Sequence, residues 1–167
     1  MRRLIHNPDN ILSSYVRPGQ TAMDVGCGPG YFTLPMAHMV GGTGMVIAVD
    51  LQPEMLAILR RRAERAGLLP RISLHRCGSA RLAVEVPVDF ALAFAVVHEA
   101  PDPQTLLGEI AALLKPAGRL LLAEPRAHVI SEAFNETVRM ARAVGLQPCA
   151  EPSIRMSRAV PLAKAGC

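Results

Sequence analysis

Three glycines alternate with other residues directly after a short apolar run, and two aspartates accompany this pattern. The stretch reads TAMDVGCGPGYF over residues 21–32, with Asp24 before the glycines, and Asp50 ends a second apolar run, MVIAVD. Glycine tolerates the positive φ of a tight turn and lets backbone N–H groups come close to a ligand. A carboxylate that ends the next strand is placed to accept hydrogen bonds from ribose hydroxyls. The pattern predicts a pocket for a cofactor that contains adenosine.

The spacing of these glycines argues against a dinucleotide. Dinucleotide-binding turns carry GxGxxG, whose third glycine allows close packing of helix and strand. Here the glycines are Gly26, Gly28 and Gly30, and Tyr31 stands where that motif has glycine. Asp24 has two interpretations, which are a role near a charged group of the cofactor and a structural role in holding N–H groups of the turn.

Candidate general bases follow two later apolar runs. His98 and Glu99 come after VDFALAFA, and Glu124 lies near the end of GRLLLAEP. Histidine has the intrinsic pKa closest to neutrality, so His98 is the best candidate to accept a proton. Two structural alternatives stay open, because His98 could bond to the backbone of its loop and Glu124 could hold the neighbouring loop. No histidine or cysteine pair has the spacing of a metal-ligand set, so no metal is predicted.

Short apolar runs alternate with helical patterns along the chain. The runs are apolar at every position, which is typical of parallel strands buried on both faces. The last two expected strands are separated only by a Pro152–Ser153 turn, so they must pair antiparallel. The expected strands cover residues 21–25, 45–50, 71–76, 88–95, 118–125, 146–151 and 154–163, and the expected helices cover residues 30–40, 53–66, 103–115 and 131–144.

This alternation predicts an α/β fold, with a doubly wound, mostly parallel seven-stranded sheet, helices on both faces and an antiparallel C-terminal hairpin. The 167 residues are expected to form a single domain over residues 1–167. Residues 1–20 form an N-terminal arm that could act as a partial lid, together with the loop at residues 126–132. Ligands of such sheets bind beyond the carboxyl ends of the strands, where the strand order reverses, so the candidate residues should meet there.

Composition argues against several other classes of protein. The chain is 50% hydrophobic and 19% charged, which is typical of globular proteins. No apolar run reaches the ~20 residues that span a bilayer, and residues 1–10 do not read as a signal peptide, so a cytoplasmic protein without membrane contact is expected. The net charge is +4, and much of the positive charge lies in LRRRAERAG at residues 59–67. A solvated helix face is the first interpretation of that stretch, and a nucleic-acid surface is the second.

The chain resembles the class I S-adenosylmethionine-dependent methyltransferases over nearly all of its length. MDVGCGPG is similar to their glycine motif, VIAVDLQPEML to the motif that grips the ribose, and VDFALAFAVVHEAPD to their fourth-strand motif. LLGEIAALLKPAGRLLLAEP is similar to the helix–strand motif that closes the sheet. The seven strands and terminal antiparallel hairpin of that family agree with the alternation described above. One departure follows the third strand, where the family often has Gly-Asp-Ala and this chain has Gly78-Ser79-Ala80.

The resemblance implies S-adenosyl-L-methionine as the cofactor and S-adenosyl-L-homocysteine as the product. It also implies that Asp50 and Leu51 hold ribose and adenine and that Phe94 lies near the sulfonium, while Ser79 could replace the usual acid at the adenine amine. The expected catalytic residues are His98 and Glu124. The expected cofactor-binding residues are Asp24, Gly26, Cys27, Gly28, Gly30, Asp50, Leu51, Ser79, Ala80 and Phe94.

The acceptor is the part of the function that the sequence defines least. Methyl transfer to a small molecule is the first hypothesis. The alternatives are methylation of a nucleic acid or a protein, and a non-catalytic subunit that binds the cofactor for a partner. An NAD-dependent oxidoreductase is a weaker alternative because Tyr31 replaces the third-spaced glycine. A homodimer is a further hypothesis, since a second copy could complete an open site.

Overall fold

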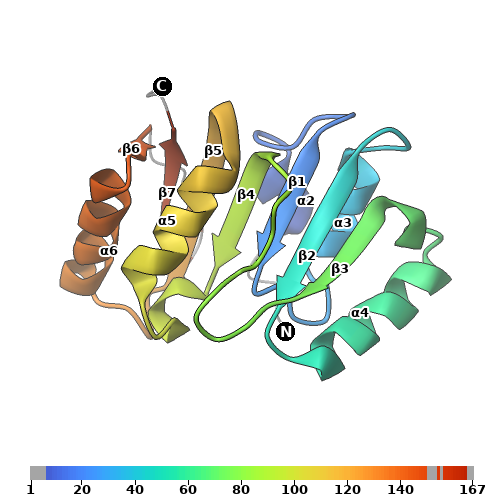
Figure 1. Ribbon diagram of the computed structural model, residues 1–167, viewed down its shortest axis with the longest axis horizontal. Helices are drawn as coiled ribbons and strands as arrows, with labels where there is room; N and C mark the ends of the chain where they lie inside the picture. Colours follow the sequence, from blue (N-terminus) through green and yellow to red (C-terminus); the bar gives the residue numbers. More distant parts are fainter. Residues whose placement is uncertain (1–6, 150–153, 155, 165–167) are drawn as a thin grey trace.

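The computed structural model describes residues 7–149, 154 and 156–164, which form one seven-stranded sheet covered by helices (Figure 1). None of the described helices is long and apolar enough to cross a membrane. The strands are β1 (Thr21–Val25), β2 (Met45–Asp50), β3 (Ile72–Arg76), β4 (Val88–Phe94), β5 (Leu114–Pro125), β6 (Gln147–Pro148) and β7 (Ser157–Ala163). The helices are α2 (Pro8–Leu12), α3 (Thr33–Met39), α4 (Pro53–Arg65), α5 (Pro103–Leu113) and α6 (Ser131–Ala143), with short 3₁₀ helices η1 (Leu69–Arg71) and η2 (Val97–Glu99).

The strand order confirms the doubly wound, mostly parallel sheet. From one edge to the other it runs β3-β2-β1-β4-β5-β7-β6. The first five strands pair in parallel, and β7 runs antiparallel to both β5 and β6. The C-terminal hairpin therefore places β7 inside the sheet and β6 at its edge, while the expected Pro152–Ser153 turn lies outside the described residues. The order reverses between β1 and β4, so the ligand crevice is expected at the carboxyl ends of these two strands.

Successive residues of one strand pack into different apolar clusters on the two faces of the sheet. In β4, Phe90 and Leu92 join a cluster with residues of α2, α3 and α4. Ala91 and Ala93, the alternate residues of the same strand, join a cluster with residues of α5 and α6. Because side chains of a strand point alternately to opposite faces, a strand covered on both sides needs apolar residues at every position. This explains the continuous apolar runs in the sequence.

The described part of the N-terminal arm packs against the α3 face of the sheet. Leu12 and Val16 are buried in the cluster on that face. The ring of Tyr15 stacks on the ring of Phe90, with 5.6 Å between the centroids. The arm therefore extends the apolar layer that anchors β4, and its predicted action as a lid stays a prediction.

The boundary between α5 and β5 differs from the sequence expectation. β5 was expected from residue 118 but begins at Leu114. Lys115 precedes a proline, which disfavours the helical conformation, and α5 therefore ends at Leu113. Pro116 and Ala117 then form a bulge, which is seen as a shift in the register of β5 against β4. Ala117 has a φ of 60° in this bulge. β1 and β2 have the expected bounds.

Candidate functional site

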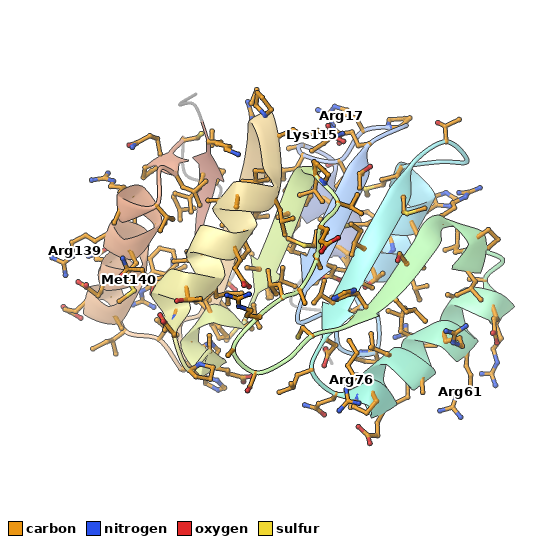
Figure 2. All side chains as sticks on the ribbon, in the orientation of Figure 1. Arg17, Arg61, Arg76, Lys115, Arg139 and Met140 are labelled. Carbon is orange, nitrogen blue, oxygen red and sulfur yellow. The ribbon has the colours of Figure 1, made fainter. Side chains whose placement is uncertain are left out.

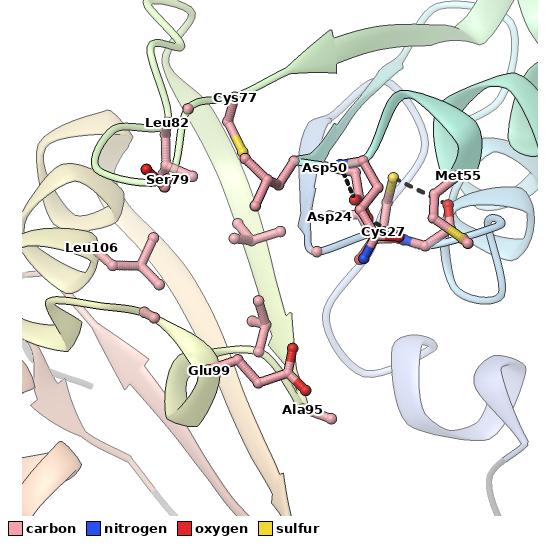
Figure 3. A pocket seen from close by; sticks show the side chains of 18 of the residues that line it. Asp24, Cys27, Asp50, Met55, Cys77, Ser79, Leu82, Ala95, Glu99 and Leu106 are labelled. Carbon is pink, nitrogen blue, oxygen red and sulfur yellow. Dashed lines mark hydrogen bonds between the residues drawn. The ribbon is translucent and has the colours of Figure 1, made fainter.

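A cavity of about 700 Å³ opens at the carboxyl ends of β1, β2 and β4 (Figure 3). It lies where the strand order reverses, which is the place expected for the ligand. Its walls come from the turn after β1, the connection from β2 into α4, the loop after β3 and the connection from β4 into α5. The lining residues are 24–29, Tyr31, Phe32, 50–52, Met55, 77–82, 94–96, 99–102, Thr105, Leu106 and Glu109.

The glycine turn after β1 is tied to β2 and packs against the β4 connection. Gly26 and Gly28 have φ values of 69° and 52°, where residues with a side chain are strained. The N–H groups of Gly26 and Cys27 both donate to the carbonyl of Val49 at 2.9 Å. A Cβ atom on Gly26 would lie 2.7 Å from Cγ2 of Val96. Glycine is therefore needed at position 26 both for its φ and for this close approach.

Gly30 has a different place from the other predicted glycines. Its φ is 87°, and a Cβ atom there would lie 2.3 Å from Cδ1 of Leu59 on α4. It lines a second cavity of about 260 Å³ between the glycine turn, the arm and α4, and Tyr31 lines both cavities. Packing against α4 explains the glycine, and the assignment of Gly30 to the cofactor stays a prediction.

Asp50 connects the end of β2 to the glycine turn. It is 8% exposed, its Oδ2 accepts the N–H of Gly28 at 2.7 Å, and its Oδ1 accepts the N–H of Gln52 at 2.8 Å. A carboxylate oxygen can accept more than one hydrogen bond. Asp50 therefore fixes the turn and keeps acceptor capacity toward the cavity that it lines.

Asp24 is buried beneath the turn, at 3% exposure, and also lines the cavity. Its Oδ2 accepts a hydrogen bond from the hydroxyl of Thr33, at the start of α3, at 2.6 Å. Burial raises the pKa of Asp24 to about 7, and the charge of Asp50 adds to that rise, while the Thr33 hydrogen bond opposes it. A cation in the cavity would favour the ionised form of this group.

The loop after β3 and two helix starts supply lining residues that the sequence reasoning missed. Ser79 and Ala80, which were predicted, lie on this loop together with Leu82. Met55 lies in the first turn of α4 and Leu106 in the first turn of α5. The first turn of a helix that follows a parallel strand lies at the carboxyl edge of the sheet, so this position was the available signal.

Aromatic side chains form the wall beside the end of β4. The predicted residue Phe94 lines the cavity, and its ring centroid lies 4.6 Å from that of Phe32. The rings of Phe32 and Tyr31 are perpendicular, with 5.1 Å between their centroids. This part of the cavity wall is therefore aromatic.

Buried Glu124 pairs with the partly exposed His98 after the end of β4. Glu124 is 1% exposed, and its Oε1 accepts the N–H groups of Val97 at 2.9 Å and of His98 at 3.1 Å. Its Oε2 lies 2.6 Å from Nδ1 of His98. Burial raises the pKa of Glu124, and the hydrogen bond from His98 opposes this rise. Because a carboxylate accepts, Nδ1 carries the proton in neutral His98, and Nε2 keeps its lone pair.

Neither member of this pair lines the cavity, whereas Glu99 does. Nε2 of His98 lies 3.9 Å from Oε1 of Glu99, whose side chain is 73% exposed. The side chain of His98 is 22% exposed. The predicted catalytic residues are thus brought together by the fold, and Glu99, beside His98, lines the cavity.

The cavity carries an excess of acidic groups in a chain of net charge +4. Five acidic residues from β1, β2, the β4–α5 connection and α5 line it, with one arginine, and such a charge pattern favours a cationic ligand over an anionic one. The acidic residues are Asp24, Asp50, Glu99, Asp102 and Glu109, and the arginine is Arg81.

Known proteins share both the sequence pattern and the fold. The family model described as "Methyltransferase domain" matches residues 22–118. An uncharacterised 37.1 kDa protein in transposon TN4556 of Streptomyces fradiae is 36% identical over 110 residues, 65% of this chain and 31% of that protein. The ubiquinone/menaquinone biosynthesis C-methyltransferase UbiE of Marinomonas sp. is 27% identical over 143 residues, 81% of this chain and 56% of that protein. The crystal structure of a SAM-dependent methyltransferase from Aquifex aeolicus has a TM-score of 0.86 and 23% identity, with coverage of 98% of this chain and 93% of that one.

These similarities cover the region that carries the cavity. The matched family region includes the glycine turn, Asp50, the loop after β3 and the first turns of α4 and α5. The chain spans 31% to 56% of the length of the two curated relatives described here. The likeness to the Aquifex aeolicus structure shows a shared fold. The predicted resemblance is confirmed, and the chain belongs to the methyltransferase domain family.

Proposed function

We propose that this protein transfers a methyl group from S-adenosyl-L-methionine to a small molecule. The observation that carries the proposal is Asp50, which closes the glycine turn at the strand-order reversal and keeps acceptor capacity toward a cavity of about 700 Å³. S-adenosyl-L-methionine supplies a methyl group on a positively charged sulfur. The acidic lining of the cavity suits that positive charge. The product S-adenosyl-L-homocysteine has no positive charge on its sulfur.

The cofactor assignments are part of this proposal. Asp50 and Leu51 hold the adenosine, the turn from Gly26 to Gly28 holds the amino-acid part, and Phe94 lies near the sulfonium. All the residues predicted to bind the cofactor line the cavity except Gly30, and this supports the assignments. The raised pKa of Asp24 supports a place for it near a cationic part of the ligand, because such a charge would stabilise its ionised form.

His98 is the proposed general base, and Glu124 orients it. The hydrogen bond at 2.6 Å to Oε2 of Glu124 fixes the proton of neutral His98 on Nδ1. Nε2 is then able to take a proton from the molecule that receives the methyl group. Transfer from a sulfonium needs chiefly alignment of the reacting atoms, which alone contributes up to roughly 7–11 kcal/mol. A base adds a further ~10²–10⁴-fold where the acceptor arrives protonated.

A small acceptor is favoured over a nucleic acid by the distribution of charge. The cavity wall is acidic, and polyphosphate ligands need a basic surface. Of the basic residues labelled in Figure 2, Arg139 lies on α6, Arg61 on α4 and Arg76 at the carboxyl end of β3, while Arg17 and Lys115 lie at the edge opposite the cavity. The relative UbiE is named for quinone biosynthesis, which agrees with a small acceptor. Methylation of nucleic acid or protein, a homodimer and a cytoplasmic location stay predictions.

Calorimetric titration with S-adenosyl-L-homocysteine and with NAD tests the cofactor. We expect binding of the first compound and none of the second. Asp50→Ala should weaken binding by at least tenfold, roughly the value of a lost charge-assisted hydrogen bond. Glu54→Ala is the matched control, because Glu54 is an exposed carboxylate in the first turn of α4 that does not line the cavity. NAD binding with no response to S-adenosyl-L-homocysteine would refute the proposal.

Transfer of a labelled methyl group to panels of small molecules, RNA and proteins tests the acceptor. Labelling of RNA or protein alone would refute the small-molecule assignment. Once an acceptor is known, His98→Asn should lower kcat by ~10²-fold or more if His98 is the base. An unchanged kcat and pH profile would remove His98 from the mechanism.

A further inference from the structure

The loop that connects β3 to β4 forms one wall of the cavity and contains one buried side chain. Of residues 78–87, all of which are described, only Leu82 is buried. Its side chain joins the apolar cluster on the α5 face of the sheet. Ser79 and Ala80, which are proposed to contact the cofactor, are exposed on the cavity side of this anchor. The position of this wall therefore depends on what fixes Leu82.

Both backbone groups of Leu82 are bound by side chains from other elements. Its N–H donates to Oε2 of Glu109, on α5, at 2.7 Å. Its carbonyl accepts a hydrogen bond from Nε2 of His75, on β3, at 2.9 Å. A carboxylate acceptor makes the stronger kind of hydrogen bond to an N–H group. Glu109 and His75 thus clamp the loop between the sheet and α5.

Backbone hydrogen bonds close residues 77–82 into a turn and tie this turn to Asp50. The N–H of Cys77 donates to the carbonyl of Asp50 at 3.1 Å, and the N–H of Gly78 donates to the carbonyl of Arg81 at 3.0 Å. Figure 3 shows Cys77, Ser79 and Leu82 on this segment, with Leu106 beside them and Asp50 across the open space. Displacement of Leu82 would therefore move the turn as a unit away from Asp50.

Glu109 lies on a helix that is itself well fixed. Asp102 caps α5 by accepting the N–H of Thr105 at 3.0 Å, and Leu107 and Ile110 on either side of Glu109 are fully buried. Glu109 is half-buried and lines the cavity. Its carboxylate therefore reaches the loop from a rigid support.

We propose that Glu109 is a positioning residue for the cofactor, which holds the turn at residues 78–81 against the adenosine end of the cavity through the N–H of Leu82. The proposal rests on the proposed cofactor site. Glu109 acts through Leu82 and makes no required contact with the cofactor. His75 is the second, weaker half of the same clamp.

Calorimetric titration of Glu109→Ala with S-adenosyl-L-homocysteine tests this role. We expect the affinity to fall roughly tenfold, because the amide of Leu82 loses its acceptor and the turn becomes free to move. Glu109→Gln keeps an oxygen that can accept the N–H and should restore most of the affinity. Gln104→Ala, on the exposed side of α5 and away from the cavity, is the matched control and should bind as the original protein does.

Two further measurements separate positioning from general stability. Titration with 5′-methylthioadenosine, which keeps the adenosine and lacks the amino acid, should show the same fold-loss in Glu109→Ala. Amide hydrogen exchange should speed up in residues 77–83 of Glu109→Ala and stay unchanged in β1 and β2. If Glu109→Ala fails to fold, His75→Ala provides the second test. It should lower the affinity for both S-adenosyl-L-homocysteine and 5′-methylthioadenosine.

The outcomes distinguish this inference from the proposed function. If the original protein does not bind S-adenosyl-L-homocysteine, the proposed function fails. If the original protein binds it and a folded Glu109→Ala binds it within twofold, the positioning role of Glu109 is refuted. A loss that Glu109→Gln does not restore, or one seen only with S-adenosyl-L-homocysteine, also contradicts the proposal.

Discussion

The turns after β1 and after β4 lie against each other at the carboxyl edge of the sheet, and they achieve positive φ by different means. The first uses glycine, with a φ of 69° at Gly26. The second uses alanine, with a φ of 58° at Ala95, a conformation that is strained for a residue with a Cβ. The side chain of Val96 occupies the space that a Cβ atom on Gly26 would need. The glycine at position 26 thus leaves the space that Val96, in the strained turn after β4, occupies.

Each of the two turns is held by the strand that follows it in sequence. The glycine turn is held by β2, the next strand in sequence, through Val49 and Asp50. The β4 turn is held by β5, since Ala95 donates to the carbonyl of Ala123 at 2.8 Å and Glu124 accepts the amides of Val97 and His98. Backbone strain persists only where the surroundings fix it. The cofactor side of the site therefore depends on β2, and the proposed catalytic side depends on β5.

Gly26→Ala should have the largest effect, because it attacks both turns at once. A Cβ atom at position 26 is strained by φ and lies 2.7 Å from Val96, so we expect a stability loss of about 2–4 kcal/mol. Urea unfolding measures it. Gly41→Ala is the control, since Gly41 has a φ of 70° and no atom within 4 Å of the added Cβ; it should cost only about 1–2 kcal/mol. Equal losses in the two variants would show that Val96 does not press on the glycine turn.

Glu124→Ala should have the next largest effect and should act on the β4 turn alone. Two amides lose their buried acceptor, so we expect a loss of about 2–3 kcal/mol in urea unfolding. Glu124→Gln keeps one acceptor oxygen and should lose less. In both variants the NMR resonance of the Nδ1–H proton of His98 should shift, because the carboxylate beside Nδ1 is gone. An unchanged His98 resonance would contradict the pairing.

Asp24, on the cofactor side of the site, should make the free energy of unfolding depend on pH. Its pKa is raised to about 7 in the folded protein, from an ordinary value of about 3.9. The folded protein therefore holds a proton that the unfolded chain releases, so this contribution to stability is full below about pH 4 and is lost as the pH rises through about 7. Asp24→Asn removes the charge, so its stability relative to the original protein should increase from pH 5 to pH 8. A constant difference in urea unfolding across that range would contradict the raised pKa.

Ala95→Gly should have the smallest effect, and its sign is the informative part. Glycine relieves the positive-φ strain but has more freedom in the unfolded chain, so we expect a net gain of up to about 1 kcal/mol, or roughly 2–4 °C in Tm. Differential scanning calorimetry measures the shift. A clear loss of stability would mean that the β4 turn is not strained at Ala95.

Much of the fold could be read from the sequence because its signals are short-range. The apolar runs predicted the strands, and the glycine spacing with Asp50 at the end of the next strand predicted the crevice. The boundary at Leu114 was missed because Pro116 and Ala117 form a bulge whose register is set by β4. The alternation of helix and strand carries no information on such a bulge.

The sequence by itself determined the kind of cofactor pocket, because the glycine turn and Asp50 belong to one strand–turn–helix–strand unit, in which the N–H of Gly28 donates to the carboxylate of Asp50. The tertiary structure decided which distant side chains support that pocket. Glu109 meets Leu82, and Glu124 meets His98, across separations of 27 and 26 residues. Such contacts follow from the order of strands in the sheet, which spacing along the chain does not encode.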